Sequence, residues 1–151
     1  MASFKGEYEH SVDNKGRVSF PAKMRKSLNP GAKDHFIVLK GLEPCLYLYP
    51  DDRWQEVEEQ LSKISSFKKK GRTVKRNFLR SAEDISLDNQ NRIGLSSSLR
   101  EYAGIDGKAI FIGAGDRIEI WSPEYLAEED AKLTMEQYEE FFEEVMSNGQ
   151  D

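Results

Sequence analysis

Apolar and polar residues alternate along two short segments of this chain, residues 18–20 and residues 93–95. Alternation of this kind predicts short β-strands with one buried face. Each segment follows a turn that begins with Asp-Asn and precedes a stretch whose apolar residues have helical spacing. The order of turn, strand and helix occurs twice, so the pattern predicts one structural unit written in two copies.

The two copies align at a spacing of 75 residues, with Asp13 against Asp88. Asp-Asn followed by two turn-forming residues predicts a tight turn. Gly16 in the first copy corresponds to Asn91 in the second, and both residue types tolerate a positive φ. We therefore expect both positions to be left-handed, as the turn of a β-hairpin requires.

The rest of each copy has the pattern of one short helix and two further strands. Pro21 and Ser96 stand where a helix would begin, since proline suits the first helical turn and serine the N-cap. The predicted helices cover residues 22–28 and 97–103. Apolar runs predict strands at residues 4–12, 36–40, 45–49, 85–87, 109–112 and 117–121. One copy buries too little surface to be stable alone, so we expect the two to pack as a pseudo-two-fold pair.

Helical spacing also predicts three longer helices outside these copies. The first contains Trp54, with Asp51 or Asp52 as its cap, and the second covers residues 73–81. The last begins at Thr134, where Gln137 three residues later gives a capping-box pattern.

Charge is unevenly distributed along the chain. The net charge is −5, yet residues 68–80 carry seven basic and no acidic residues, whereas residues 119–151 carry eleven acidic residues and one lysine. The first 118 residues therefore have a net charge of +5. This asymmetry is a better guide to partners than the total charge, and it is compatible with a polyanionic partner.

Chemistry-bearing residues do not form an enzymatic pattern. The single cysteine, Cys45, excludes an internal disulfide and lies in an apolar run that predicts a buried strand residue. His10 and His35 lack metal-ligand spacing, the glycines of residues 113–115 fit a tight turn, and the serines of residues 96–98 fit a helix cap. We therefore expect no catalytic residue, no metal site, no cofactor and no small-molecule substrate.

The cellular location is predicted from the absence of long apolar segments in the sequence. No stretch approaches the ~20 apolar residues that cross a bilayer, and the first residues lack the apolar run of a signal peptide. The sequence therefore predicts a cytoplasmic protein without a membrane partner.

The segment from Asp13 to Arg25 resembles the opening of the AbrB/SpoVT family of bacterial transcription factors. A chain with both copies, each with Asp-x-x-x-Arg, resembles the MraZ proteins of that family, which regulate the division and cell-wall gene cluster. The resemblance implies an α+β fold: a swapped-hairpin, AbrB-like double-psi-type barrel made from two ββαββ repeats, with peripheral helices. It covers residues 7–54 and 83–126, with a basic helical connector at residues 55–82 and an acidic C-terminal helix at residues 127–151.

The resemblance also implies sequence-specific binding of double-stranded DNA, at repeated promoter boxes, by a ring of several subunits associated with the nucleoid. The candidate DNA contacts are the basic residues of the turns and of the helices after them: Arg17, Arg92, Lys15, Lys23, Arg25 and Arg100. The candidate structural residues of the motif are Asp13, Asp88, Gly16 and Asn91. Since Gln90 and Ser98 replace Lys15 and Lys23 in the second copy, we expect Arg17 to dominate recognition.

Three alternatives stay open at this stage. Each arginine has a structural interpretation, as the ion-pair partner of the aspartate four residues earlier, and this is compatible with DNA binding. The basic run at residues 68–80 is a solvated helix face, a second DNA surface, or a surface that meets the acidic C-terminal helix of its own or a neighbouring chain. The alternative function is an antitoxin-like protein that binds a partner protein through that helix, which contains Tyr138, Phe141 and Phe142.

Overall fold

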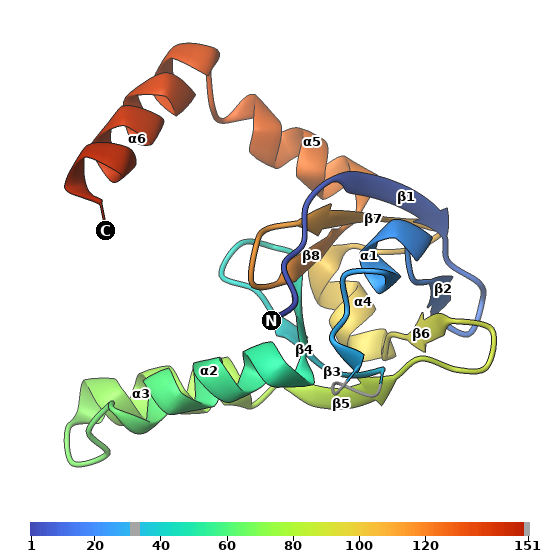
Figure 1. The fold of residues 1–151 in the computed structure, drawn as a ribbon, viewed down its shortest axis with the longest axis horizontal. Helices are drawn as coiled ribbons and strands as arrows, with labels where there is room; N and C mark the ends of the chain where they lie inside the picture. Colours follow the sequence, from blue (N-terminus) through green and yellow to red (C-terminus); the bar gives the residue numbers. More distant parts are fainter. Residues whose placement is uncertain (31–33, 150–151) are drawn as a thin grey trace.

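The computed structural model describes residues 1–30 and 34–149, and it shows an α+β chain built from two equivalent sets of elements (Figure 1). The first set is β1 (Glu7–Ser11), β2 (Arg17–Ser19), α1 (Ala22–Arg25), β3 (His35–Lys40), β4 (Leu46–Pro50) and α2 (Asp51–Ser62). The second set is β5 (Glu83–Ser86), β6 (Arg92–Gly94), α4 (Ser97–Ala103), β7 (Lys108–Gly113), β8 (Ile118–Trp121) and α5 (Pro123–Ala131). The sets are joined by α3 (Lys69–Leu79), and α6 (Met135–Asn148) follows the second.

The main sheet combines strands of both copies. Its order is β1-β7-β8-β4-β3-β5, with antiparallel pairing throughout. When each strand is replaced by its equivalent in the other copy, the same list results, read from the opposite end. A two-fold relation between the copies has this effect. The first strand of each copy lies at an edge of the sheet and pairs with the third strand of the other copy. Neither copy completes its own part of the sheet.

The pseudo-two-fold axis that relates the copies passes between the members of two residue pairs. In the centre of the main sheet, Tyr47 of β4 is opposite Glu119 of β8. In a separate two-stranded ladder, Val18 of β2 is opposite Ile93 of β6. Each pair joins residues that occupy the same position in their copies, so the sequence repeat is also a repeat in space.

The hydrophobic core has two layers because β3 and β4 are buried on both faces. Phe36 and Val38 point to one layer, where the β2–β6 ladder, α1 and α4 close the interior. Ile37 and Leu39 point to the other, which α2, α3 and α5 cover. There the ring of Trp54 stacks on Phe78, with a centroid distance of 6.4 Å. The continuous apolar runs of these central strands follow from this double burial.

Helix boundaries agree with the sequence where a cap fixes them. Ser96 accepts a hydrogen bond from the backbone N–H of Leu99, and Gly104 ends α4 with a φ of 65°. Thr134 and Gln137 form the predicted capping box of α6. These three predictions are confirmed.

Other helix predictions were wrong. No aspartate caps α2: Pro50 is at the N-cap, and Asp51 and Asp52 lie in the first turn, where carboxylates interact favourably with the helix dipole. The helix predicted at residues 22–28 ends at Arg25, and the one predicted at residues 73–81 begins at Lys69.

The sequence reasoning missed α5 altogether. The signal was present, since the side chain of Ser122 accepts a hydrogen bond from the N–H of Tyr125 at 3.1 Å and Pro123 occupies the first helical turn. This helix, not α6, is the equivalent of α2.

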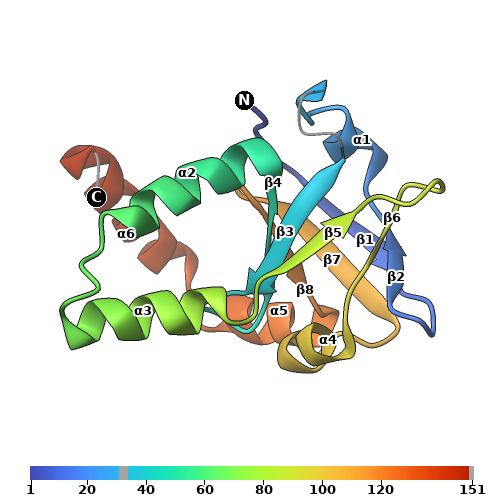
Figure 2. The same cartoon turned by 90° about the horizontal axis from the view of Figure 1, so that it is seen from below.

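The α2–α3 hairpin and the single helix α6 extend from the body of the molecule. Figures 1 and 2 show the α2–α3 hairpin on the side opposite the two Asp-Asn turns, and Figure 1 shows α6 apart from both. All residues of α6 are exposed. Among the helices in the described part of the chain, none combines the length and apolar character needed to cross a membrane.

Candidate nucleic-acid interface

The first turn is organised around the carboxylate of Asp13. Its Oδ1 accepts the backbone N–H groups of Lys15 at 3.0 Å and Arg17 at 2.8 Å, and its Oδ2 accepts Nε of Arg17 at 2.8 Å. Backbone bonds between Asp13 and Arg17 and from Gly16 to Asp13 close the turn. Gly16 has the predicted positive φ, at 82°.

The second turn reproduces this arrangement atom for atom. Oδ1 of Asp88 accepts the N–H groups of Gln90 at 2.8 Å and Arg92 at 2.9 Å, and Oδ2 accepts Nε of Arg92 at 2.9 Å. Asn91 has a φ of 60°, so the prediction of a left-handed residue is confirmed in both copies. The Asp-x-x-x-Arg spacing is thus the spacing at which one carboxylate closes the turn and orients the arginine.

These hydrogen bonds favour the charged form of both carboxylates. The backbone N–H of Arg17, followed by the side chain of Arg17 and the N–H of Lys15, lowers the pKa of Asp13 to about 2, although partial desolvation opposes the shift. The backbone N–H of Arg92 is likewise the main cause that lowers the pKa of Asp88. Both groups are therefore ionised at neutral pH and hold their arginines in place.

Each arginine uses only part of its donor capacity in the turn. A guanidinium has five N–H donors, and the Arg17 side chain gives one, from Nε, to Asp13. Among the described residues the terminal nitrogens of Arg17 have no partner, and their parallel N–H groups suit bidentate contacts with phosphate or guanine. The Arg17 side chain is 38% exposed and that of Arg92 is 25% exposed, with Nη1 of Arg92 at 4.0 Å from Oδ2 of Asp13. Arg17 is therefore the more accessible of the two.

Cross-copy hydrogen bonds join the turns into one unit. The N–H of Leu95 donates to the carbonyl of Gly16 at 2.9 Å, and the N–H of Phe20 donates to the carbonyl of Asn91 at 2.9 Å. A Cβ at Gly16 would lie 2.5 Å from the carbonyl oxygen of Leu95 and 2.6 Å from Nε of Arg100. Glycine is required there for its conformation and for the close approach of the other copy.

The remaining candidate residues differ in accessibility. Lys15 and Lys23 are exposed, while Arg25 and Arg100 are half-buried. Nε of Arg100 donates to the carbonyl of Leu95 at 3.0 Å, a structural role that the sequence did not reveal. The two turns lie on the same side of the molecule (Figure 2), whereas Lys23 and Arg25 belong to α1 and Arg100 belongs to α4.

The basic run at residues 68–80 lies elsewhere. It forms α3, on the side opposite the turns (Figure 2). Arg72 donates to the carbonyls of Ser66 and Phe67, and Lys75 donates to the hydroxyl of Ser66. Within residues 1–30 and 34–149, no ion pair joins α3 to α6.

One cluster of potential metal ligands is explained by hydrogen bonding instead. Ligand atoms of Glu43, Cys45 and Glu119 lie within 4.8 Å of one another. Burial raises the pKa of the Cys45 thiol. The carboxylates already accept hydrogen bonds from the Tyr47 hydroxyl at 2.8 Å and from Nε1 of Trp121 at 2.9 Å. The predicted buried position of Cys45 is confirmed.

Comparison with known proteins gives a consistent result. A family model described as "MraZ protein, putative antitoxin-like" matches the chain twice, at residues 3–77 and 78–148. A transcriptional regulator MraZ from Syntrophomonas wolfei is 43% identical over 97% of this chain and 99% of its own length. Proteins of the same name from Caldanaerobacter subterraneus and Alkaliphilus oremlandii are 43% and 45% identical, over 93% and 79% of this chain and 94% and 80% of their own lengths. That name is one of regulators, not enzymes, and the double match agrees with the two copies in the fold. The chain therefore belongs to the MraZ family.

Proposed function

We propose that this protein is a sequence-specific DNA-binding transcriptional regulator of the cytoplasm and nucleoid. The observation that carries the proposal is the pair of turns in which an aspartate binds Nε of an arginine and orients it, while the terminal nitrogens of Arg17 have no partner among the described residues. The name of the relatives supports the regulatory role. The target is double-stranded DNA, at repeated boxes in the promoter of the division and cell-wall gene cluster.

The two turns divide the work unequally. Arg17 contacts base edges or phosphates through its terminal nitrogens, while Lys15 and Lys23 contact phosphates beside it. The second turn carries Gln90 in place of Lys15, and Arg92 is less exposed. Asp13 repels phosphate by itself, but its charge is balanced by Arg17 at 2.8 Å. The first turn therefore supplies most of the recognition, and Arg25, Arg92 and Arg100 add to it.

The fold that presents these turns is, in our proposal, the AbrB-like swapped-hairpin barrel. The exchange of first strands between copies supports it. The division into repeats at residues 7–54 and 83–126, a basic connector at residues 55–82 and an acidic C-terminal helix at residues 127–151 belongs to the same proposal. One protomer offers few cations, so we propose that several protomers form a ring on successive boxes, which raises avidity by ~10²–10⁴.

Three matched variants test the function. Arg17→Ala and Arg92→Ala each remove one guanidinium, and Lys63→Ala removes an exposed cation next to α2. Binding is measured by fluorescence anisotropy on the DNA upstream of the gene and on a scrambled duplex of equal length. We expect Arg17→Ala to weaken specific binding by ~10-fold or more, Arg92→Ala by less, and Lys63→Ala not at all. Wild-type affinity in Arg17→Ala, with an intact fold, would refute the proposal.

A second candidate function is an antitoxin-like role in which α6 binds a partner protein. The family description contains that term, and α6 exposes Tyr138, Phe141 and Phe142 on an acidic helix. Purification from native cells distinguishes the two candidates. A foreign protein bound in equal amounts, and lost when residues 132–151 are deleted, would favour the antitoxin-like role.

A further inference from the structure

The exposed face of α6 is unusual for a surface helix. Large apolar side chains that recur at helical spacing are between 50% and 70% exposed: Met135, Tyr138, Phe141, Phe142, Val145 and Met146. Between them lie five glutamates, and the helix contains no basic residue. An apolar stripe on an acidic helix needs a partner that is both apolar and basic.

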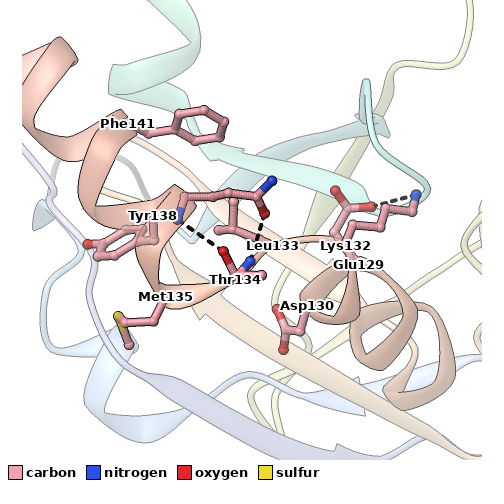
Figure 3. A pocket seen from close by; sticks show the side chains of 9 residues that line it. Glu129, Asp130, Lys132, Leu133, Thr134, Met135, Tyr138 and Phe141 are labelled. Carbon is pink, nitrogen blue, oxygen red and sulfur yellow. Dashed lines mark hydrogen bonds and ion pairs between the residues drawn. The ribbon is translucent and has the colours of Figure 1, made fainter.

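The connection to α5 holds this helix away from the body. Lys132 and Leu133 continue the backbone hydrogen bonds of α5, to Glu129 and Asp130, and the capping box then starts α6 in a new direction. Figure 3 shows the resulting notch, with Leu133, Met135, Tyr138 and Phe141 on its wall. We call residues 132–148 the C-terminal arm. Every residue of the C-terminal arm is exposed, so the arm projects from the body.

A surface with the complementary properties lies beside α3. A groove of about 440 Å³ runs between α3, the turn after β3 and α4, and its apolar wall is made by Leu42, Val74, Phe78 and Tyr102. Leu42 is 84% exposed and Val74 is 52% exposed. We call this the α3 groove.

The rim of the α3 groove is basic. Nζ of Lys40 lies over the Tyr102 ring at 5.2 Å from its centroid. A second hollow, which shares Lys40 with the groove, is lined by Arg80 and by Glu83, whose carboxylate accepts a hydrogen bond from the Ser96 hydroxyl at 2.9 Å. Lys70 stands four residues before Val74 and so on the same face of α3. The α3 groove therefore offers what the C-terminal arm requires: exposed apolar side chains framed by cations.

We propose that the C-terminal arm of one copy of this chain docks in the α3 groove of the next copy. The two surfaces differ, so each chain uses its arm on one neighbour and its groove on the other, and such head-to-tail contacts close into a ring. This inference rests on the ring assembly proposed above and names the surfaces that build it. The DNA-binding turns lie on the side opposite α3 and are left free (Figure 2).

Two variants that each introduce one charge test the docking. Val74→Glu places an acid where the acidic arm would dock, and Phe141→Lys places a base where the arm would meet the basic rim. Both side chains are more than half exposed, so neither variant is expected to unfold. Glu58→Lys, on the exposed face of α2, is the matched control. The mass of each protein is measured by light scattering.

We expect the wild type and Glu58→Lys to have a mass of several times 17.3 kDa, and each docking variant to fall to 17.3 kDa. The decisive sample is an equimolar mixture of the two docking variants. The intact arm of Val74→Glu fits the intact groove of Phe141→Lys, so the mixture should form complexes larger than a single chain.

Other outcomes overturn the inference. A monomeric wild type, docking variants of wild-type mass, or a mixture that stays as single chains would each refute it. Binding to a single box separates this result from the DNA proposal, since monomeric variants with intact turns should retain it. If docking is lost and single-box binding is retained, the proposed DNA-binding function stands. If docking is retained and single-box binding is absent, only the DNA-binding function is refuted.

Discussion

Replacing Gly16 by alanine tests how the two copies are joined at the candidate site. Gly16 has a φ of 82°, and its carbonyl accepts the N–H of Leu95 from the other copy. An added Cβ would lie 2.5 Å from the Leu95 carbonyl oxygen. That atom belongs to the backbone of the residue that follows β6, and it cannot rotate away as a side chain would.

The cost has two parts. A left-handed alanine costs ~1–2 kcal/mol, and forcing extra volume into a packed position costs ~1–3 kcal/mol. We expect Gly16→Ala to lower the free energy of unfolding by ~3 kcal/mol, which lowers the Tm by ~6–12 °C for a chain of this size.

The equivalent position of the second copy provides the control. Asn91 is left-handed and already carries a Cβ, so Asn91→Ala retains the conformational cost without new volume. We expect that variant to lose ~1 kcal/mol and Asn91→Gly to lose almost nothing. Thermal and urea unfolding at equal protein concentration measure all three. Equal losses in Gly16→Ala and Asn91→Ala would refute the argument from close approach.

Three further predictions concern single side chains. Asp13→Asn removes a carboxylate whose pKa is lowered from 3.8 to about 2, so its contribution to stability is full above ~pH 4 and is lost as the pH falls towards 2. Urea titrations should show that the wild type is more stable than the variant at pH 6. The same difference in stability at pH 2 would contradict this. Ser122→Ala removes the buried cap of α5 and should cost ~1–2 kcal/mol in the same assay; an unchanged urea midpoint would show that the cap is dispensable. Lys15→Ala should reduce the salt slope of DNA binding by ~0.9 at unchanged sequence preference; anisotropy in buffers of about 50–200 mM salt measures it, and an unchanged slope would mean that Lys15 does not contact a phosphate.

Much of the local structure could be predicted because a few side chains determine it. The left-handed residues followed from Gly16 and Asn91, and the start of α6 followed from Thr134 and Gln137. In each case the cause lies within four residues of the effect. The same reasoning failed for α2, where Asp51 and Asp52 were expected to cap and instead lie in the first turn.

The exchange of strands between the copies was beyond the reach of local pattern. A strand such as β1 has the same alternation whether its partner is near or far in the sequence, and only the complete sheet shows that it pairs with β7. The second role of Arg100, as a donor to the Leu95 carbonyl, was hidden for the same reason. The candidate DNA contacts themselves remain predictions that the variants above test.

The strand exchange has a consequence for synthesis of the chain on the ribosome. β1 pairs with β7, which ends at Gly113, and β3 finds its second neighbour only in β5. At ~5–20 residues per second, several seconds pass between the emergence of β1 and the emergence of its partner. During that interval the nascent first copy has unpaired strand edges, which are open to pairing with a neighbouring nascent chain. Carrying both copies in one chain limits this interval to a single round of translation, whereas separate chains would have to find each other by diffusion.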